Sequence, residues 1–407
     1  MFEFGRDLRK LFAQARESED LGWVELIGVD LLRVEARRES IDAGRVSCSR
    51  PFETEHRAAA LWRDHARRSG AVDSLDRADR AAESLSRNAV GEDQTALAAI
   101  DTALALILRF DLCGDPDRLQ QAMVALARAG HPRRHRIATE AASAHARIKA
   151  RQARMSGIFS DLMDAAALMD SALHGAGSED AELRMDRAIL ALDAGVVQRD
   201  PRLLDQAGRD LGALVEAASP DHRPLTRARA LTLCGAGLSA LAAVAGHAEA
   251  HAQGRTMFDA AADQLTPDHS PLDWAAIQVM RAGEEALPLM ILSQAETLTQ
   301  GQGLIIGALA RERRIAREIA LAEAVRNLSA LELLEQRLRA RMGHALPLDW
   351  AADQIGMASI GLARQRLGGA EPTGLGLILS EAATTAMEMG VPALANRAEA
   401  LKPRFVT

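Results

Sequence analysis

The chain has 407 residues, a hydrophobic content of 48% and a formal net charge of −7, which together exclude a disordered protein and a strongly basic nucleic-acid binder. It has no Tyr and is rich in Ala, Leu, Arg and Glu, so the composition predicts an all-α fold. Three scattered cysteines, a charged N-terminus without a secretory signal and the scarcity of Lys beside Arg favour a cytoplasmic protein from a GC-rich bacterial genome.

The first segment, residues 2–16, is predicted to be an amphipathic helix, because its large apolar residues recur at helical spacing beside three basic residues. Such a helix can pack on the next predicted helix, residues 20–37, enter a partner's groove or lie in an anionic membrane interface. With a third predicted helix at residues 53–68, it forms an N-terminal helical cap, residues 1–70. The candidate interaction segment comprises Phe2, Phe4, Leu8, Leu11 and Phe12.

Residues 71–300 carry a repeat with a period of about 42–47 residues. Its marker is the pattern Leu-x-x-Ala, which occurs four times at separations of 44, 43 and 42 residues. Fixed periods of this size are typical of stacked helix pairs, each of which buries its apolar face on its neighbours. The four copies begin at Leu75, Leu119, Leu162 and Leu204 and end at Ala78, Ala122, Ala165 and Ala207.

Gly, Pro and Asp are expected to separate the helices, with Asp and Ser residues as N-caps. The uncharged stretch 230–246 is predicted to be a buried central helix, in which Gly235 and Ser239 allow a neighbouring helix to approach closely. Residues 301–407 are predicted to hold further repeats and capping helices, including a helix break near Asn327. The other expected breaks lie at 91–93, 113–116, 130–132, 174–177, 199–201, 219–224, Gly254 and 266–271.

A hexapeptide occurs twice, as Pro-Leu-Asp-Trp-Ala-Ala at 271–276 and at 347–352, where Asp353 and Gln354 follow. This motif resembles the opening of the first helix in bacterial tetratricopeptide-like repeats of about 42 residues, which are similar in length to those of kinesin light chains. The resemblance implies an α-solenoid of antiparallel helix pairs, wound as a right-handed superhelix, that acts as an adaptor. HEAT-like units match the period alone. Trp274 and Trp350 are expected to be buried at the joints between units.

The weak metal candidates are His247 and His251, because imidazoles four residues apart share a helix face. A solvated connector that contains two histidines is the alternative. His131 and His135 have the same spacing, but Pro132 interrupts a helix between them.

Two basic runs, residues 133–136 and 311–317, are expected to be solvated helix faces with i,i+4 ion pairs, and contacts with phosphates are the alternative. Neither run has the interleaved aromatic residues that stack on bases.

The sequence contains no nucleotide-binding loop and no hydrolase or metalloprotease motif, so we expect neither an enzyme nor a cofactor. The leading hypothesis is a non-enzymatic scaffold that binds a partner peptide or helix on its concave surface. One alternative is a peripheral membrane or polar-localised scaffold anchored by the N-terminal helix. Another is a metal-dependent helical protein that uses His247 and His251.

Overall fold

The computed structural model describes residues 21–176, 180–343, 345–369 and 374–402, and this part of the chain is all-helical, without strands. It contains 18 α-helices and one 3₁₀ helix. They are η1 (Gly22–Leu26), α2 (Val29–Ala43), α3 (Pro51–Ser69), α4 (Val72–Asn88), α5 (Gly91–Cys113), α6 (Asp117–Ala127), α7 (His135–Ser156), α8 (Phe159–Ala176), α9 (Ala181–Gln198), α10 (Pro201–Ala217), α11 (Pro224–Ala245), α12 (Ala248–Gln264), α13 (Pro271–Glu284), α14 (Leu289–Thr299), α15 (Ile305–Ala324), α16 (Leu328–Met342), α17 (Pro347–Arg366), α18 (Leu375–Glu388) and α19 (Pro392–Leu401).

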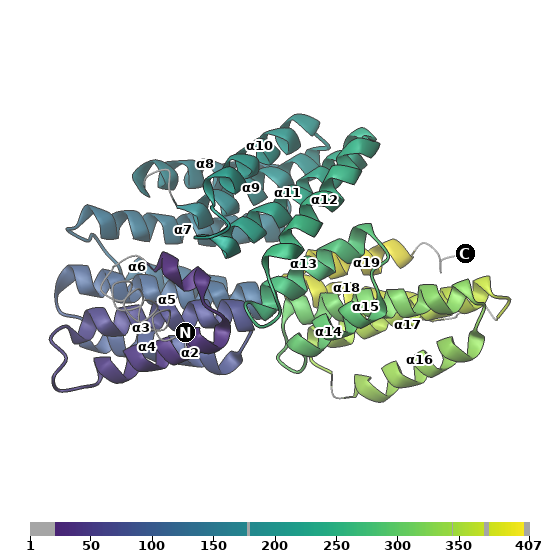
Figure 1. Ribbon diagram of the computed structural model, residues 1–407, viewed down its shortest axis with the longest axis horizontal. Coiled ribbons are helices and arrows are strands. Elements are labelled where there is room, and N and C mark those ends of the chain that lie inside the picture. The colour runs from purple at the N-terminus through teal and green to yellow at the C-terminus, as the bar shows by residue number, and fades with distance from the viewer. Residues whose placement is uncertain (1–20, 177–179, 344, 370–373, 403–407) are drawn as a thin grey trace, which may run out of the picture.

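Successive helices pack against each other, and each odd-numbered helix from α3 to α15 also contacts the next odd-numbered helix. In Figure 1, α7–α12 lie above α2–α6, and α13–α19 extend the body beyond both. The chain returns to its beginning, because α13 contacts α3, α15 contacts α5 and α11 contacts η1. The odd-numbered helices α3 to α13 therefore form a closed ring of contacts around an interior.

The four leucines of the repeat lie near the start of alternate helices, α4, α6, α8 and α10, and are buried together with their alanines. Their predicted equivalence in successive helix pairs is thus confirmed. The pattern also returns where the sequence analysis did not find it. Leu292 and Ala295 in α14, and Leu379 and Ala382 in α18, are buried copies.

Most of the predicted helix ends are confirmed. Asp180 and Asp200 cap α9 and α10 by accepting hydrogen bonds from backbone N–H groups, as their residue type favours. Asn327 separates α15 from α16 and accepts a hydrogen bond from the Ala330 N–H. The last two helices of the chain's described part, α18 and α19, lie where capping helices are expected.

The predicted break at Gly254 is wrong, because α12 runs through this residue. Gly254 is buried against α11, where a Cβ would lie 3.1 Å from the Gly235 carbonyl oxygen and 3.2 Å from Ser239 Oγ. Beside it, the ring of Phe258 fills the space over Gly235. The close approach of a neighbouring helix that was expected at Gly235 and Ser239 is confirmed. Gly254 of α12 allows this contact and does not form a turn.

By length and composition, α11 is the only described helix apolar enough to cross a membrane. Of its most apolar 18-residue stretch, 33% is buried. It contacts η1, α9, α10, α12 and α13. Its buried residues, including Leu225, Ala228 and Leu231, lie mostly in its first half. The helix is therefore a central packing element of this fold, as expected, with a partly exposed second half.

The N-terminal region differs from its prediction. Residues 20–37 do not form one helix, because the chain turns at Gly28 between η1 and α2. The candidate interaction segment, residues 2–12, lies outside the described residues. Arg68 of α3 fastens this region, since its buried guanidinium donates hydrogen bonds to the carbonyl oxygens of Val24, Ile27 and His269.

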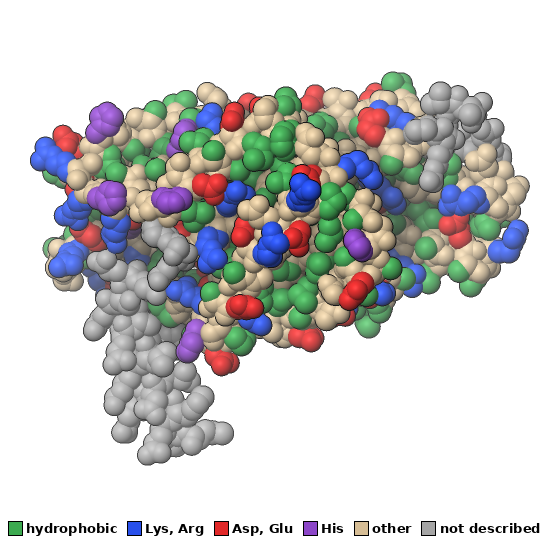
Figure 2. Space-filling model, turned by 90° about the horizontal axis from the view of Figure 1, so that it is seen from above, with side chains coloured by type: hydrophobic (Ala, Val, Ile, Leu, Met, Phe, Trp, Pro, Cys, Tyr) green, Lys and Arg blue, Asp and Glu red, His purple; other side chains and the backbone are tan. Residues whose placement is uncertain are grey.

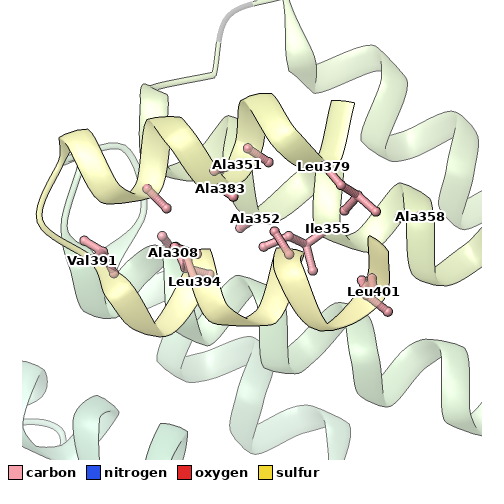
Figure 3. Packing of buried hydrophobic residues seen from close by; sticks show 14 of the residues in the cluster. Ala308, Ala351, Ala352, Ile355, Ala358, Leu379, Ala383, Val391, Leu394 and Leu401 are labelled. Atoms are coloured by element: carbon pink, nitrogen blue, oxygen red, sulfur yellow. The ribbon is translucent and has the colours of Figure 1, made fainter. Parts of the chain in front are cut away.

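The two tryptophans occupy the first turns of α13 and α17. Trp274 is buried as predicted, but it packs with residues of α14 and α15 rather than against the preceding helix. Trp350 is only partly buried, at the margin of the C-terminal core. In that core, Leu379 of α18 and Leu394 of α19 lie around Ile355 of α17 (Figure 3).

Candidate functional site

The interior of the ring is lined by one face of each odd-numbered helix from α3 to α13. On α3 this face carries His56, Ala60, Arg63 and Arg67, which are three or four residues apart and so lie on the same side of the helix. Charged residues occur on the corresponding faces of the other five helices. They are Asp101 and Asp111 on α5, Glu140 and Arg147 on α7, Glu182 and Asp186 on α9, Arg229 on α11 and Asp273 on α13.

Four cavities lie along these faces and share lining residues, and we call them together the inner cavity. The two larger chambers measure about 720 and 550 Å³, the first between η1, α3, α9, α10 and α11, the second between α3, α5 and α7. Two smaller chambers, of about 210 and 240 Å³, are both lined by Arg67, Arg147 and Glu182. The inner cavity is therefore a branched space with Glu182 at its junction.

Ion pairs join the helices across the inner cavity. Glu182 of α9 pairs with Arg67 of α3 and with Arg147 of α7, whose Nη2 lies 3.2 Å from Glu182 Oε2. Arg67 lowers the pKa of Glu182 strongly, and Arg147 and Arg229 add to the effect against the cost of burial. A carboxylate held by guanidinium groups stays ionised. Glu182 thus connects helices that are far apart in the sequence.

A second set of ion pairs links α5, α7 and α9. Arg151 donates bidentate hydrogen bonds of 2.9 and 3.1 Å to Asp111, and Arg151 Nη1 also contacts Asp186 at 2.7 Å. Arg147 Nε contacts the same Asp186 oxygen at 3.0 Å. Burial alone would favour the neutral acid, but the two arginines outweigh it and lower the pKa of Asp186. These pairs bind α7 to both α5 and α9.

The last two helices of the ring, α11 and α13, are joined by a bidentate pair in which both hydrogen bonds from Arg229 to Asp273 measure 2.8 Å. Ser270 Oγ donates a further hydrogen bond of 2.6 Å to Asp273. Burial disfavours the ionised form of Asp273, but Arg229 outweighs burial and lowers its pKa. The aspartate in the first copy of the hexapeptide is therefore paired with an arginine of α11, the preceding helix of the ring.

In the 550 Å³ chamber, Asp101 is fully buried between His56 and Arg63. Burial disfavours the imidazolium, but Asp101 outweighs burial and raises the pKa of His56. Glu140, from the opposite wall, has its pKa raised by burial. The chamber thus contains groups whose charges respond to pH.

A separate charged cluster lies between α14, α15, α16 and α17. Arg311 and Arg314, both buried, contact Glu296 of α14, and Arg341 contacts Asp353 at 3.0 Å. The expectation of a solvated run at residues 311–317 is therefore wrong for its two buried arginines, which pair between helices. In the other run, Arg133 and Arg134 are exposed as expected, but they lie in the loop before α7 and pair with Glu92 and Asp93 at the start of α5. Arg136 forms the expected i,i+4 pair, with Glu140.

The candidate metal ligands are not brought together with further ligands. His247 caps α12 and His251 lies in its first turn, where its Nδ1 is 3.0 Å from Glu284 Oε2. Within the described residues, no group of three or more His, Cys, Asp or Glu side chains is placed to hold a metal ion. His131 lies in the loop before α7, which begins at His135.

The inner cavity was not predicted from the sequence, in which Asp273 stood out only as part of the repeated hexapeptide. A usable signal was present, because Asp101 is the only charged residue between Asp93 and Arg109 in an apolar helix, where burial demands a partner. On the outer face shown in Figure 2, side chains of both charge signs are interspersed with apolar ones. The charged residues that line the inner cavity therefore differ from those of the outer face in their burial and their ion pairs, and not in how many of them there are.

No protein-family model matches this chain, and no curated protein matches it significantly. The packed successive helix pairs are compatible with a helical repeat.

Proposed function

We propose that the chain is a non-enzymatic interaction scaffold, a tetratricopeptide-like α-solenoid that holds an extended segment of a partner protein in the inner cavity. The observation that supports this proposal is the convergence of six helix faces on one branched space. Its larger chambers have the size of typical ligand pockets. A narrow, branched space suits an extended peptide better than a folded domain.

The lining provides both polar and apolar contacts for such a peptide. Leu104, Ile107 and Leu108 of α5 form an apolar side of one chamber, and Met185 and Ile189 of α9 form that of another. Guanidinium and carboxylate groups lie beside them and can pair with side chains or with the peptide backbone. Pockets with an apolar lining and a few fixed polar groups give both affinity and orientation.

Peptide display against the full-length chain tests this proposal. Ala60 lines two chambers, so Ala60→Phe should obstruct them, whereas Ala252→Phe adds the same ring on the exposed face of α12. We expect selected peptides to bind the wild type and A252F equally and A60F at least about tenfold more weakly. Equal binding to A60F and A252F, with both variants folded by circular dichroism, would place the binding surface elsewhere and reject the proposal.

The alternative is a peripheral membrane or polar-localised scaffold anchored by Phe2, Phe4, Leu8, Leu11 and Phe12. The composition of this segment supports it, and so does the apolar second half of α11. Co-sedimentation with vesicles of anionic phospholipid distinguishes the two functions. Binding that is lost on deletion of residues 2–12 and retained in A60F would favour the membrane role.

A further inference from the structure

Glu182 occupies a position that a partner's carboxylate could take. Its own carboxylate pairs with Arg67 and Arg147, and the guanidinium of Arg229 adds to the positive field around it. These three arginines come from α3, α7 and α11, and all three line the 240 Å³ chamber together with Glu182. The structure thus contains a cradle of three arginines that is open to the inner cavity.

Glu182 is the most accessible of the carboxylates that pair with Arg67, Arg147 and Arg229. Its side chain is 42% exposed, whereas those of Asp186 and Asp273 are 12% and 17% exposed. Asp186 and Asp273 are therefore fixed parts of the wall. The Glu182 carboxylate can move into the water of the cavity at little cost in desolvation, and Arg67 has no other ion-pair partner among the described residues.

We infer that Glu182 is an internal substitute for an acidic side chain of the partner, and that an acidic peptide binds by exchanging a carboxylate with Glu182 among Arg67, Arg147 and Arg229. This inference rests on the proposed function and specifies its ligand class. Guanidinium groups favour carboxylates because their planar N–H donors match two carboxylate oxygens. Glu182 competes with the carboxylate of the peptide for the same arginines, and so sets the affinity of an acidic peptide.

The test compares two charge-neutralising variants. Glu182→Gln removes the competing carboxylate at constant size. Glu332→Gln makes the same change of net charge at an exposed side chain 3.9 Å from Arg364 and outside the inner cavity. The probes are two fluorescein-labelled octapeptides, with the alternating sequences Glu-Ala and Gln-Ala, and binding is measured by fluorescence anisotropy.

We expect E182Q to bind the Glu-Ala peptide at least about tenfold more tightly than the wild type or E332Q, with no gain for the Gln-Ala peptide. Adding Arg67→Gln to E182Q should abolish the gain. An equal gain in E182Q and E332Q, or no binding of the Glu-Ala peptide to E182Q, would overturn the inference.

The inference and the proposed function can fail separately. If displayed peptides bind in an A60F-sensitive manner but are unaffected by E182Q, the scaffold function stands and the acidic ligand is wrong. If no displayed peptide responds to A60F, the function itself is wrong.

Discussion

The hexapeptide Pro-Leu-Asp-Trp-Ala-Ala begins both α13 and α17, yet its aspartate meets opposite conditions at the two sites. Asp273 accepts two hydrogen bonds of 2.8 Å from Arg229, and its pKa is lowered. Asp349 lies 3.4 Å from Arg311, and burial raises its pKa because Arg311 does not compensate. Identical local sequence thus gives identical helix starts but different electrostatics.

The difference arises from the neighbours. Asp353 lies one turn after Asp349 on α17, so two carboxylates share the arginines of this cluster with Glu296. Burial raises the pKa of Asp353 to about 6. In the ring, by contrast, the arginines that pair with Glu182, Asp186 and Asp273 outweigh burial and lower the pKa of each of these carboxylates. The positions of the arginines in the neighbouring helices, and not the motif itself, therefore decide whether the aspartate of the hexapeptide stabilises the fold.

The largest predicted effect is that of Arg229→Met, which leaves Asp273 buried without its partner. We expect a loss of ~3–5 kcal/mol in the free energy of unfolding, measured by urea denaturation at pH 7. Arg311→Met at the equivalent pair should cost clearly less, because Asp349 and Asp353 take up a proton more easily than Asp273. Equal losses in the two variants would remove the contrast between the regions. Arg209→Met, in an exposed pair with Asp205, is the control.

The leucines of the Leu-x-x-Ala repeat should contribute equally to stability in the ring and in the C-terminal helices. Leu119→Ala in α6 and Leu292→Ala in α14 each truncate a side chain that is 1% exposed at a corresponding place. Both should lower the free energy of unfolding by ~2–5 kcal/mol, through lost burial and the cavity left behind. Leu333→Ala, at an exposed site, should change it by less than ~0.5 kcal/mol. A small effect at Leu292 alone would show that the C-terminal copies of the motif are not equivalent.

Asp353→Asn should change the pH dependence of stability. The pKa of Asp353 is about 6 in the folded chain and ~3.8–3.9 when unfolded, so the folded state binds the proton more tightly. The wild type should therefore lose ~1–3 kcal/mol relative to D353N as the pH rises from 4 to 7, in paired urea titrations. Asp273→Asn should show the opposite sign, because its folded pKa is lowered. Parallel pH profiles for wild type and D353N would contradict the assigned burial effect.

The smallest effect is expected for His56→Gln. Because the pKa of His56 is raised in the folded state, its pairing with Asp101 stabilises the fold at pH values below the unfolded pKa. That stability is lost as the pH rises through the folded value. The difference in melting temperature between wild type and H56Q should be larger at pH 6 than at pH 8, and correspond to less than ~1 kcal/mol. His222→Gln, at an exposed residue, serves as control.

Local signals explain which parts of the fold were predictable. A capping Asp or Asn, or a Pro at the first helical position, acts through its own backbone and the next three residues, so helix ends such as those at Asp200 and Asn327 follow from the sequence. The helix break predicted at Gly254 is wrong because a glycine can either end a helix or permit close helix packing. Only the neighbouring helix shows which of the two roles the glycine has. The turn at Gly28 and the helix α14 were likewise missed.

By itself, the sequence determined the all-helical class, most helix boundaries and the burial of the leucines at the repeat positions, because propensity, caps and periodicity act over a few residues. The tertiary structure alone decided the closure of α3 on α13 and the pairing of Arg67 with Glu182, 115 residues later. It also decided that the pKa of Asp273 is lowered whereas that of Asp349 is raised. The free energy of a buried charge depends on partners that only the folded chain brings within a few ångströms.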